Sequence, residues 1–187
     1  MPPDSTDTKR RLVEAARAEF AEHGLAGARV DRIAERAGAN KRSIYMHFGD
    51  KEDFFDLIVS TSLLELAEAV PFVVSDIPSY AGKLYRTLQS RPDILRLTSW
   101  AVLERPRPLE SEMDSYRGKV ESIRQAQQDG GVTTEHDAAT VMAMVLALVT
   151  SWDHASWSLR AVRGADSPGD QQADVERAVA KLVSPEP

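Results

Sequence analysis

Residues 29–55 of this 187-residue chain read RVDRIAERAGANKRSIYMHFGDKEDFF, and this stretch decides the fold. Apolar residues recur there at helical spacing, first over residues 30–37 and again over 41–48. Gly38 between the two segments can take the left-handed conformation of a sharp turn, and Asn40 can cap the second helix. Two short helices joined by a three-residue turn that contains Gly predict a helix-turn-helix.

The helical period continues on both sides of this stretch, and runs of alternating β-branched residues are missing. We therefore predict an all-α fold of about nine helices. An N-terminal three-helix domain that contains the helix-turn-helix is expected over residues 1–50, and a larger C-terminal helical domain over 51–187. A helix over 51–70 should link the two. The expected helices cover residues 8–23, 30–37, 41–48, 51–70, 79–90, 92–104, 111–128, 135–159 and 170–183.

The charge is unevenly distributed along the chain. The net charge is −6, but residues 1–48 carry nine basic and seven acidic side chains, against 14 and 22 in the remainder. A slightly basic segment thus precedes a strongly acidic one, which fits a small DNA-binding module in a larger acidic protein. Basic stretches are also common on ordinary solvated faces, so the asymmetry alone decides little.

Composition excludes several classes of protein. The chain has no cysteine, so it can form neither a disulfide framework nor a thiolate metal site. The N-terminus is polar and lacks the apolar core of a signal peptide. The most apolar stretch, residues 138–152, is too short to span a membrane comfortably. We expect a cytoplasmic protein with no membrane partner.

The segment 41–48 has two different faces. Ile44 and Phe48 lie four residues apart and should anchor the helix in the core. The opposite rows pair Arg42 with Met46 and Ser43 with His47. Arg can grip guanine and Met can contact a thymine methyl group in a major groove, and residues near the helix N-terminus, here Lys41–Ser43, normally reach the bases. Face sorting alone leaves an ordinary surface helix equally open.

The quoted stretch resembles the DNA-binding domain of the tetracycline-repressor (TetR) family. The resemblance covers roughly residues 8–70 and rests on an Ile-Ala-x-x-Ala-Gly helix, a capped Lys-x-Ser-Ile-Tyr-x-His-Phe helix and the Lys-Glu pair that follows. Beyond residue 70 the chain resembles the family only in helical layout and length. The resemblance implies a ligand-responsive transcriptional regulator, by default a repressor, that binds a palindromic operator in double-stranded DNA as a homodimer and is released by a small-molecule effector. It makes residues 1–50 the helix-turn-helix DNA-binding domain and residues 51–187 the helical ligand-binding and dimerisation domain.

The same resemblance implies roles for single residues. Base contacts are expected from Lys41, Arg42, Ser43 and Met46, and phosphate contacts from Tyr45, His47 and Lys51. Lys51 also lies in the first turn of a helix, where the dipole favours a phosphate. Partial core packing is the alternative for Tyr45. Where the family often has Ser or Thr, this chain has Ala28-Arg29, so a hydroxyl contact is either replaced by Arg29 or lost.

The C-terminal part supplies the predicted dimer interface. The helix expected over 135–159 is apolar on nearly every side, so one core would not cover it and a second subunit is implied, although full burial within one subunit is the alternative. With the stripe of the last helix it would form a four-helix interface across a two-fold axis. We expect this interface to include Val145, Val149, Val175, Val179 and Leu182.

Aromatic and Met side chains could line an effector pocket among the C-terminal helices, although each could equally be simple core. The pocket predicted from the sequence consists of Tyr85, Trp100, Met113, Tyr116, Met142 and Trp152. A protein of the same fold that binds small molecules but no operator is the alternative function.

Catalysis, cofactors and resident metals are not expected. Asp153 and His154 are adjacent on a helix and point apart, so they cannot form a base with its orienting partner. His154 is either a core histidine or a hydrogen-bonding group of the pocket. The four histidines are scattered without metal-ligand spacing, and Gly130-Gly131 lacks the context of a phosphate-binding loop.

Overall fold

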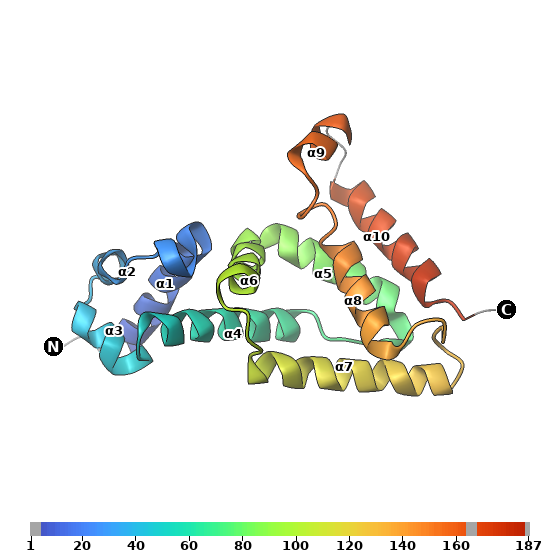
Figure 1. Cartoon of the computed structure of the whole chain (residues 1–187), viewed down its shortest axis with the longest axis horizontal. Coiled ribbons are helices and arrows are strands. Elements are labelled where there is room, and N and C mark those ends of the chain that lie inside the picture. The colour runs from blue at the N-terminus through green and yellow to red at the C-terminus, as the bar shows by residue number, and fades with distance from the viewer. Residues whose placement is uncertain (1–4, 164–167, 186–187) are drawn as a thin grey trace. The chain divides into compact units, whose positions relative to one another are not determined.

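The computed structural model describes residues 5–163 and 168–185, and this part of the chain is helical without any strand (Figure 1). The all-α prediction is therefore confirmed. Ten α-helices and one short 3₁₀ helix are described, one α-helix more than predicted. They are α1 (Ser5–Gly27), α2 (Val30–Ala37), α3 (Lys41–Phe48), α4 (Lys51–Ala69), η1 (Val74–Asp76), α5 (Ile77–Ser90), α6 (Pro92–Glu104), α7 (Glu110–Gln128), α8 (Ala138–Val149), α9 (Trp157–Arg163) and α10 (Pro168–Val183).

Two compact units make up the chain. The first contains the chain up to Glu65 together with Arg91–Glu112, and the second contains Leu66–Ser90 together with the chain from Met113 onward. The first unit thus extends past the boundary predicted at residue 50 and includes α6. Aromatic packing joins α4 to this unit, because Phe20 of α1 meets Phe54 and Phe55 of α4 edge to face, at 6.0 and 5.2 Å between ring centroids, and α6 packs against α1.

Local signals in the sequence fix the helix-turn-helix as predicted. Gly38 adopts φ 59° and ψ 39° after α2, and the Asn40 side chain accepts a hydrogen bond from the Arg42 backbone N–H at 2.8 Å. Asp50 and Asp53 then form a reciprocal cap at the start of α4, since each side chain accepts from the other's backbone N–H. These caps end one helix and begin the next within a few residues.

Gly24 divides α1 rather than ending it. The residue has φ 67° and ψ −176°, and a short helical segment follows it to Gly27. The space is also restricted, because a Cβ atom at Gly24 would lie 2.7 Å from the Trp100 ring and 2.8 Å from the Glu104 carboxylate. Both the backbone conformation and the close approach of α6 therefore require glycine here.

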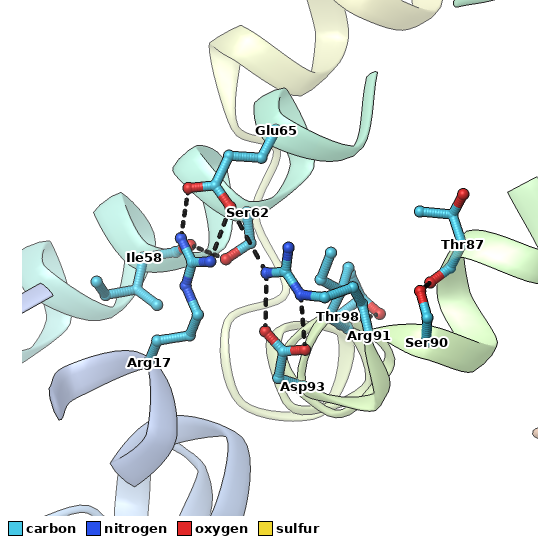
Figure 2. Close-up of polar contacts among 10 residues, drawn as sticks. Arg17, Ile58, Ser62, Glu65, Thr87, Ser90, Arg91, Asp93 and Thr98 are labelled. Atoms are coloured by element: carbon cyan, nitrogen blue, oxygen red, sulfur yellow. Dashed lines mark hydrogen bonds and ion pairs between the residues drawn. The ribbon is translucent and has the colours of Figure 1, made fainter. Parts of the chain in front are cut away.

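A chain of ion pairs ties α1, α4 and α6 together within the first unit (Figure 2). The Glu65 carboxylate of α4 accepts two hydrogen bonds from Arg17 of α1, at 2.7 and 2.6 Å. Arg91 lies 3.5 Å from the same carboxylate and donates to Asp93 at the start of α6. These charge-assisted contacts give the first unit a defined arrangement of its three longer helices.

In the second unit, α10 packs against α5 and α8, and α5 packs against α8. The long helix predicted over 135–159 is wrong: α8 begins after Asp137, whose side chain caps Ala139 and Thr140, and it ends at Val149. From residue 151 the backbone hydrogen bonds tighten, with Asp153 N–H donating to the Thr150 carbonyl. Arg160 satisfies carbonyls of the turn at Asp153 and Ala155, which explains the extra helix α9.

Four valines predicted to face a second subunit lie inside the second unit instead. Their exposed fractions are 0% for Val145, 1% for Val149, 5% for Val175 and 0% for Val179. The packing of α8 and α10 within one chain already covers these four side chains, so the exposed parts of the two helices consist of other residues. Leu182 is half-buried. The exposed side of α8 carries the small residues Ala139, Ala143 and Ala147.

Candidate DNA-binding surface

The α3 helix presents one anchored and one open face. Ile44 is fully buried, whereas Met46 is 69% and Tyr45 48% exposed. The Arg42 side chain is exposed and has no partner among the described residues. Tyr45 is thus available at the helix edge rather than packed in the core. This side of α3 offers a guanidinium, a thioether and a phenol to a partner.

Lys41 is the one predicted base-reading cation that already has a partner. Its ammonium group lies 2.8 Å from the carboxylate of Asp31 on α2, and the hydrogen bond between them raises the pKa of Lys41. Both side chains are exposed to solvent. The pair crosses from α2 to α3, so a DNA phosphate or base would have to compete with Asp31 for this lysine.

The first turn of α2 depends on a residue that sequence reasoning missed. Glu19 of α1 is 1% exposed, and its carboxylate accepts from the Arg29 backbone N–H at 2.9 Å and from Arg32 Nε at 2.7 Å. Burial raises the pKa of Glu19, but these hydrogen bonds outweigh it and hold the pKa below 4.5. The sequence did contain a signal for this burial. Glu19 directly precedes Phe20, at a position that the helical period of α1 places beside the buried face.

Glu19 therefore accepts hydrogen bonds at the N-terminus of α2, where the family often has a hydroxyl residue. Arg29 uses its backbone for this contact, and its side chain is exposed. Arg32 additionally donates to the Gly27 carbonyl at 3.0 Å. The side chain of Arg29 is thus free to approach a phosphate, while Arg32 is held in place by α1 and the loop before α2.

Lys51 and His47 lie beside this surface in more enclosed positions. The Lys51 ammonium group donates to the carbonyls of Ala28 at 3.3 Å and Ala26 at 3.5 Å. His47 is half-buried, with its ring 6.0 Å from that of Phe48. Ser43 is also half-buried. Lys51 consequently ties the start of α4 to the loop before α2, besides lying where a phosphate contact is predicted.

The residues predicted for an effector pocket do not share one unit. Trp100 lies in the first unit, where it packs against the core beside Gly24. The other predicted residues lie in the second unit. There Tyr85 donates a hydrogen bond to Gln171, and the Arg163 guanidinium lies 3.9 Å from the centre of the Trp152 ring. Met142 is buried, and Met113 and Tyr116 are half-buried on α7.

Two family models match this chain. The model for bacterial regulatory proteins of the tetR family covers residues 12–58, and the model for the tetracyclin repressor-like C-terminal domain covers residues 76–184. The chain belongs to the TetR family. It is a helix-turn-helix, DNA-binding transcriptional regulator, and the predicted family and fold are confirmed.

Individual relatives support this assignment over most of the length. The HTH-type transcriptional repressor SCO4008 of Streptomyces coelicolor is 38% identical over 149 residues, which is 78% of each chain. The crystal structure of SCO4942 from the same organism superposes with a TM-score of 0.84 at 32% identity, covering 94% of this TetR-family chain and 98% of that one. The repressor AcnR of Corynebacterium glutamicum is 40% identical over 65 residues, 35% of each chain.

Two further observations concern groups outside the DNA-binding surface. Within residues 5–163 and 168–185, no cluster of three His, Cys, Asp or Glu side chains could hold a metal ion. In the same ranges no single helix is long and apolar enough to cross a membrane, although α4 and the segment after it pass that test as a bent pair.

Proposed function

We propose that this TetR-family regulator is a repressor that binds a palindromic operator as a homodimer in the cytoplasm and is released by a small-molecule effector. The observation that carries the proposal is the division of α3. Ile44 fixes the helix from behind, and Arg42 and Met46 face outward without a partner in the described chain. A guanidinium and a thioether on one open face suit guanine and the thymine methyl group.

The phosphate contacts proposed for Arg29, Tyr45, His47 and Lys51 surround that face. Phosphate contacts position a protein on the duplex but do not specify sequence. Tyr45 and Arg29 are exposed and can meet a phosphate without rearrangement. Lys51 would share its ammonium group between a phosphate and the carbonyls that it already contacts, at the positive end of α4.

A homodimer is proposed because a single recognition helix contacts too little DNA. One recognition helix covers only a few base pairs, so useful affinity needs two copies about 34–36 Å apart on successive major grooves. The exposed faces of α8 and α10 are the proposed interface. The alanines of α8 let another helix approach closely, and Leu182 adds a half-buried apolar group on α10. The repressor role rests on similarity to SCO4008 and AcnR, which are transcriptional repressors.

The response to an effector would pass through α4, which begins in the first unit and continues into the second. Coupling of this kind is a difference in ligand affinity between two states, typically about 1–3 kcal/mol. The second-unit residues Tyr85, Met113, Tyr116, Met142 and Trp152 stay proposed as the lining of an effector pocket. Trp100 packs against the core of the first unit and lies outside this proposed pocket.

A salt titration tests the DNA-binding part of this proposal. Fluorescence anisotropy of labelled duplex DNA should show an affinity that falls linearly, on logarithmic axes, as salt rises, with a slope that reports the number of phosphates contacted. Arg29→Ala should flatten the slope by about one, whereas Arg86→Ala on α5 should not change it. The absence of binding to any duplex at low salt would favour a sensor of the same fold that reads no operator.

A further inference from the structure

A cavity of about 380 Å³ lies within the first unit, separate from the residues predicted for an effector pocket. It is bounded by α4, by the C-terminal half of α6 and by the segment that leads to α7. Its volume is within the range of about 300–1,000 Å³ that is usual for small-molecule sites. The apolar part of the lining consists of Val59, Leu63, Ala101, Val102, Pro106 and Leu109.

One end of the cavity is charged. Asp56 accepts two hydrogen bonds from Arg105, at 3.1 and 2.6 Å, and a further one from Arg107. Burial raises the pKa of Asp56, but the two guanidinium groups outweigh it and hold the pKa below 3.8. Two cations therefore share one ionised carboxylate here. Glu52 also pairs with Arg105 but is largely exposed at the rim, and Glu112, which has a partner of its own, completes the charged lining.

Arg107 is the cation of the cavity that has unused hydrogen-bond donors. It is 55% exposed, and among the described residues its guanidinium makes a single hydrogen bond, to Asp56. Arg105 is only 13% exposed, and all three of its guanidinium nitrogens donate to Asp56 or Glu52. A guanidinium has five N–H donors in a planar fork that matches a carboxylate. Most donors of Arg107 are thus open at the mouth of an apolar cavity.

We propose that this cavity binds a small molecule with an apolar body and one carboxylate, which Arg107 holds while the body fills the space between α4 and α6. A cationic molecule of the same shape is disfavoured because the open donors at this mouth belong to Arg107, whereas the carboxylates of Asp56, Glu52 and Glu112 already have partners. A neutral molecule would gain the apolar contacts but not the charge-assisted hydrogen bonds.

The same segment is connected to the DNA reader. Glu104, next to Arg105, accepts hydrogen bonds from the backbone N–H groups of Leu25 and Ala26, just after the break at Gly24. Lys51 donates to the carbonyls of the same loop. A carboxylate that draws Arg107 from Asp56 would displace the segment that carries Glu104, and thereby the loop before α2. This consequence rests on the proposed function, whereas binding to the cavity does not.

Binding is tested on the full chain with three probes that share a ten-carbon body: decanoate, decyltrimethylammonium and 1-decanol. Isothermal titration below the aggregation limit of each probe should give the tightest binding for decanoate. Arg107→Gln should weaken decanoate about tenfold, in line with loss of hydrogen bonds to a charged group, and leave decanol unchanged. Arg96→Gln, at an exposed position of α6 outside the cavity, is the matched control and should change neither.

Equal or tighter binding of the cationic probe would overturn the proposal, as would decanoate binding that Arg107→Gln leaves intact. Because Arg107 is largely exposed, the variant should fold, and unchanged circular dichroism checks this. A second titration follows operator DNA by anisotropy. If decanoate binds through Arg107 but does not alter DNA affinity, the cavity is upheld and the coupling to the DNA reader is refuted.

Discussion

The helices α3 and α8 differ in how their apolar residues are distributed, and the difference decides what each surface can be assigned to do. In α3 a single buried Ile44 lies opposite exposed polar groups, so the outward face is defined by the sequence itself. In α8 almost every residue is apolar, and hydrophobicity does not tell which side faces solvent. The structure shows which side is which: Val141, Val145 and Val149 are buried, whereas Ala143 and Ala147 are exposed.

The exposed face of α3 thus suits DNA recognition, whereas the exposed face of α8 suits dimerisation. The open face of α3 carries groups that can discriminate between bases, and the helix that presents it is capped by Asn40 and anchored by the buried Ile44. The most exposed row of α8 consists of alanines, whose methyl groups cannot discriminate between bases but allow a second helix to pack closely. The following predictions test each side of the comparison, from the largest expected effect to the smallest.

Ala143→Arg should abolish the homodimer. In a two-fold interface the substituted residue faces its own copy or close neighbours, so two added charges would be buried together. A monomer can bind only one half-site at a time, so the affinity gained by binding both half-sites together is lost. Operator affinity should therefore fall by ~100-fold or more. Sedimentation velocity measures the assembly, and Ala143→Ser is the control that should stay dimeric. A dimer that survives Ala143→Arg would remove α8 from the interface.

Arg42→Ala should cost ~1–3 kcal/mol of binding to the preferred operator, since the guanidinium is expected to grip a guanine. Binding to random duplex should change little by comparison, and the preference at one position of each half-site should relax. Competition anisotropy with matched and mismatched duplexes measures both. Arg36→Ala, at an exposed position of α2, serves as the comparison. Equal losses on every sequence would mean that Arg42 contacts phosphate only.

Val145→Ala should lower the free energy of unfolding by about 2 kcal/mol, because two methyl groups leave a fully buried site and a cavity remains. The dimer should persist at concentrations where the protein is folded. Urea denaturation at fixed protein concentration gives the stability. If stability is unchanged and the dimer weakens instead, Val145 faces the partner, as the sequence had suggested.

Much of the first unit could be predicted because its signals are local. Gly38, Asn40 and the Asp50–Asp53 cap fix helix ends within a few residues, and α2, α3 and α6 begin and end where the period and the breakers placed them. The exposed side of α3 followed from one amphipathic turn. The ion pairs of Glu19 with Arg32 and of Asp56 with Arg105 link residues far apart in sequence, so no local pattern reveals them.

The second unit was predicted less well because its decisive contacts are made in three dimensions. An apolar run alone suggested a helix that continues past Val149, whereas the turn after α8 is held by Arg160 of α9, which donates to the carbonyls of Asp153 and Ala155. Burial of Val175 and Val179 depends on how α10 packs on α5 and α8. Trp100 resembled a pocket residue by composition, but the space left by Gly24 places it in the core of the first unit.

Asp31→Ala should raise DNA affinity by about two- to fivefold, the smallest effect in this series, because exposed ion pairs contribute little. The change frees Lys41 from its 2.8 Å pair and removes a negative charge near the proposed DNA path. The salt dependence should steepen by about one charge. Glu35→Ala removes a similar exposed charge without freeing Lys41 and controls for net charge. Equal gains from both variants would assign the effect to charge alone.

The central claim is that two copies of α3, one from each subunit, recognise the two halves of an operator. Selection of bound fragments from random duplex DNA with the purified full chain tests this claim most directly. The account predicts enrichment of a palindrome whose two half-sites are centred about one helical turn apart, each with a guanine that Arg42→Ala ceases to select. Enrichment of a single unpaired site, or of no sequence at low salt, would contradict it.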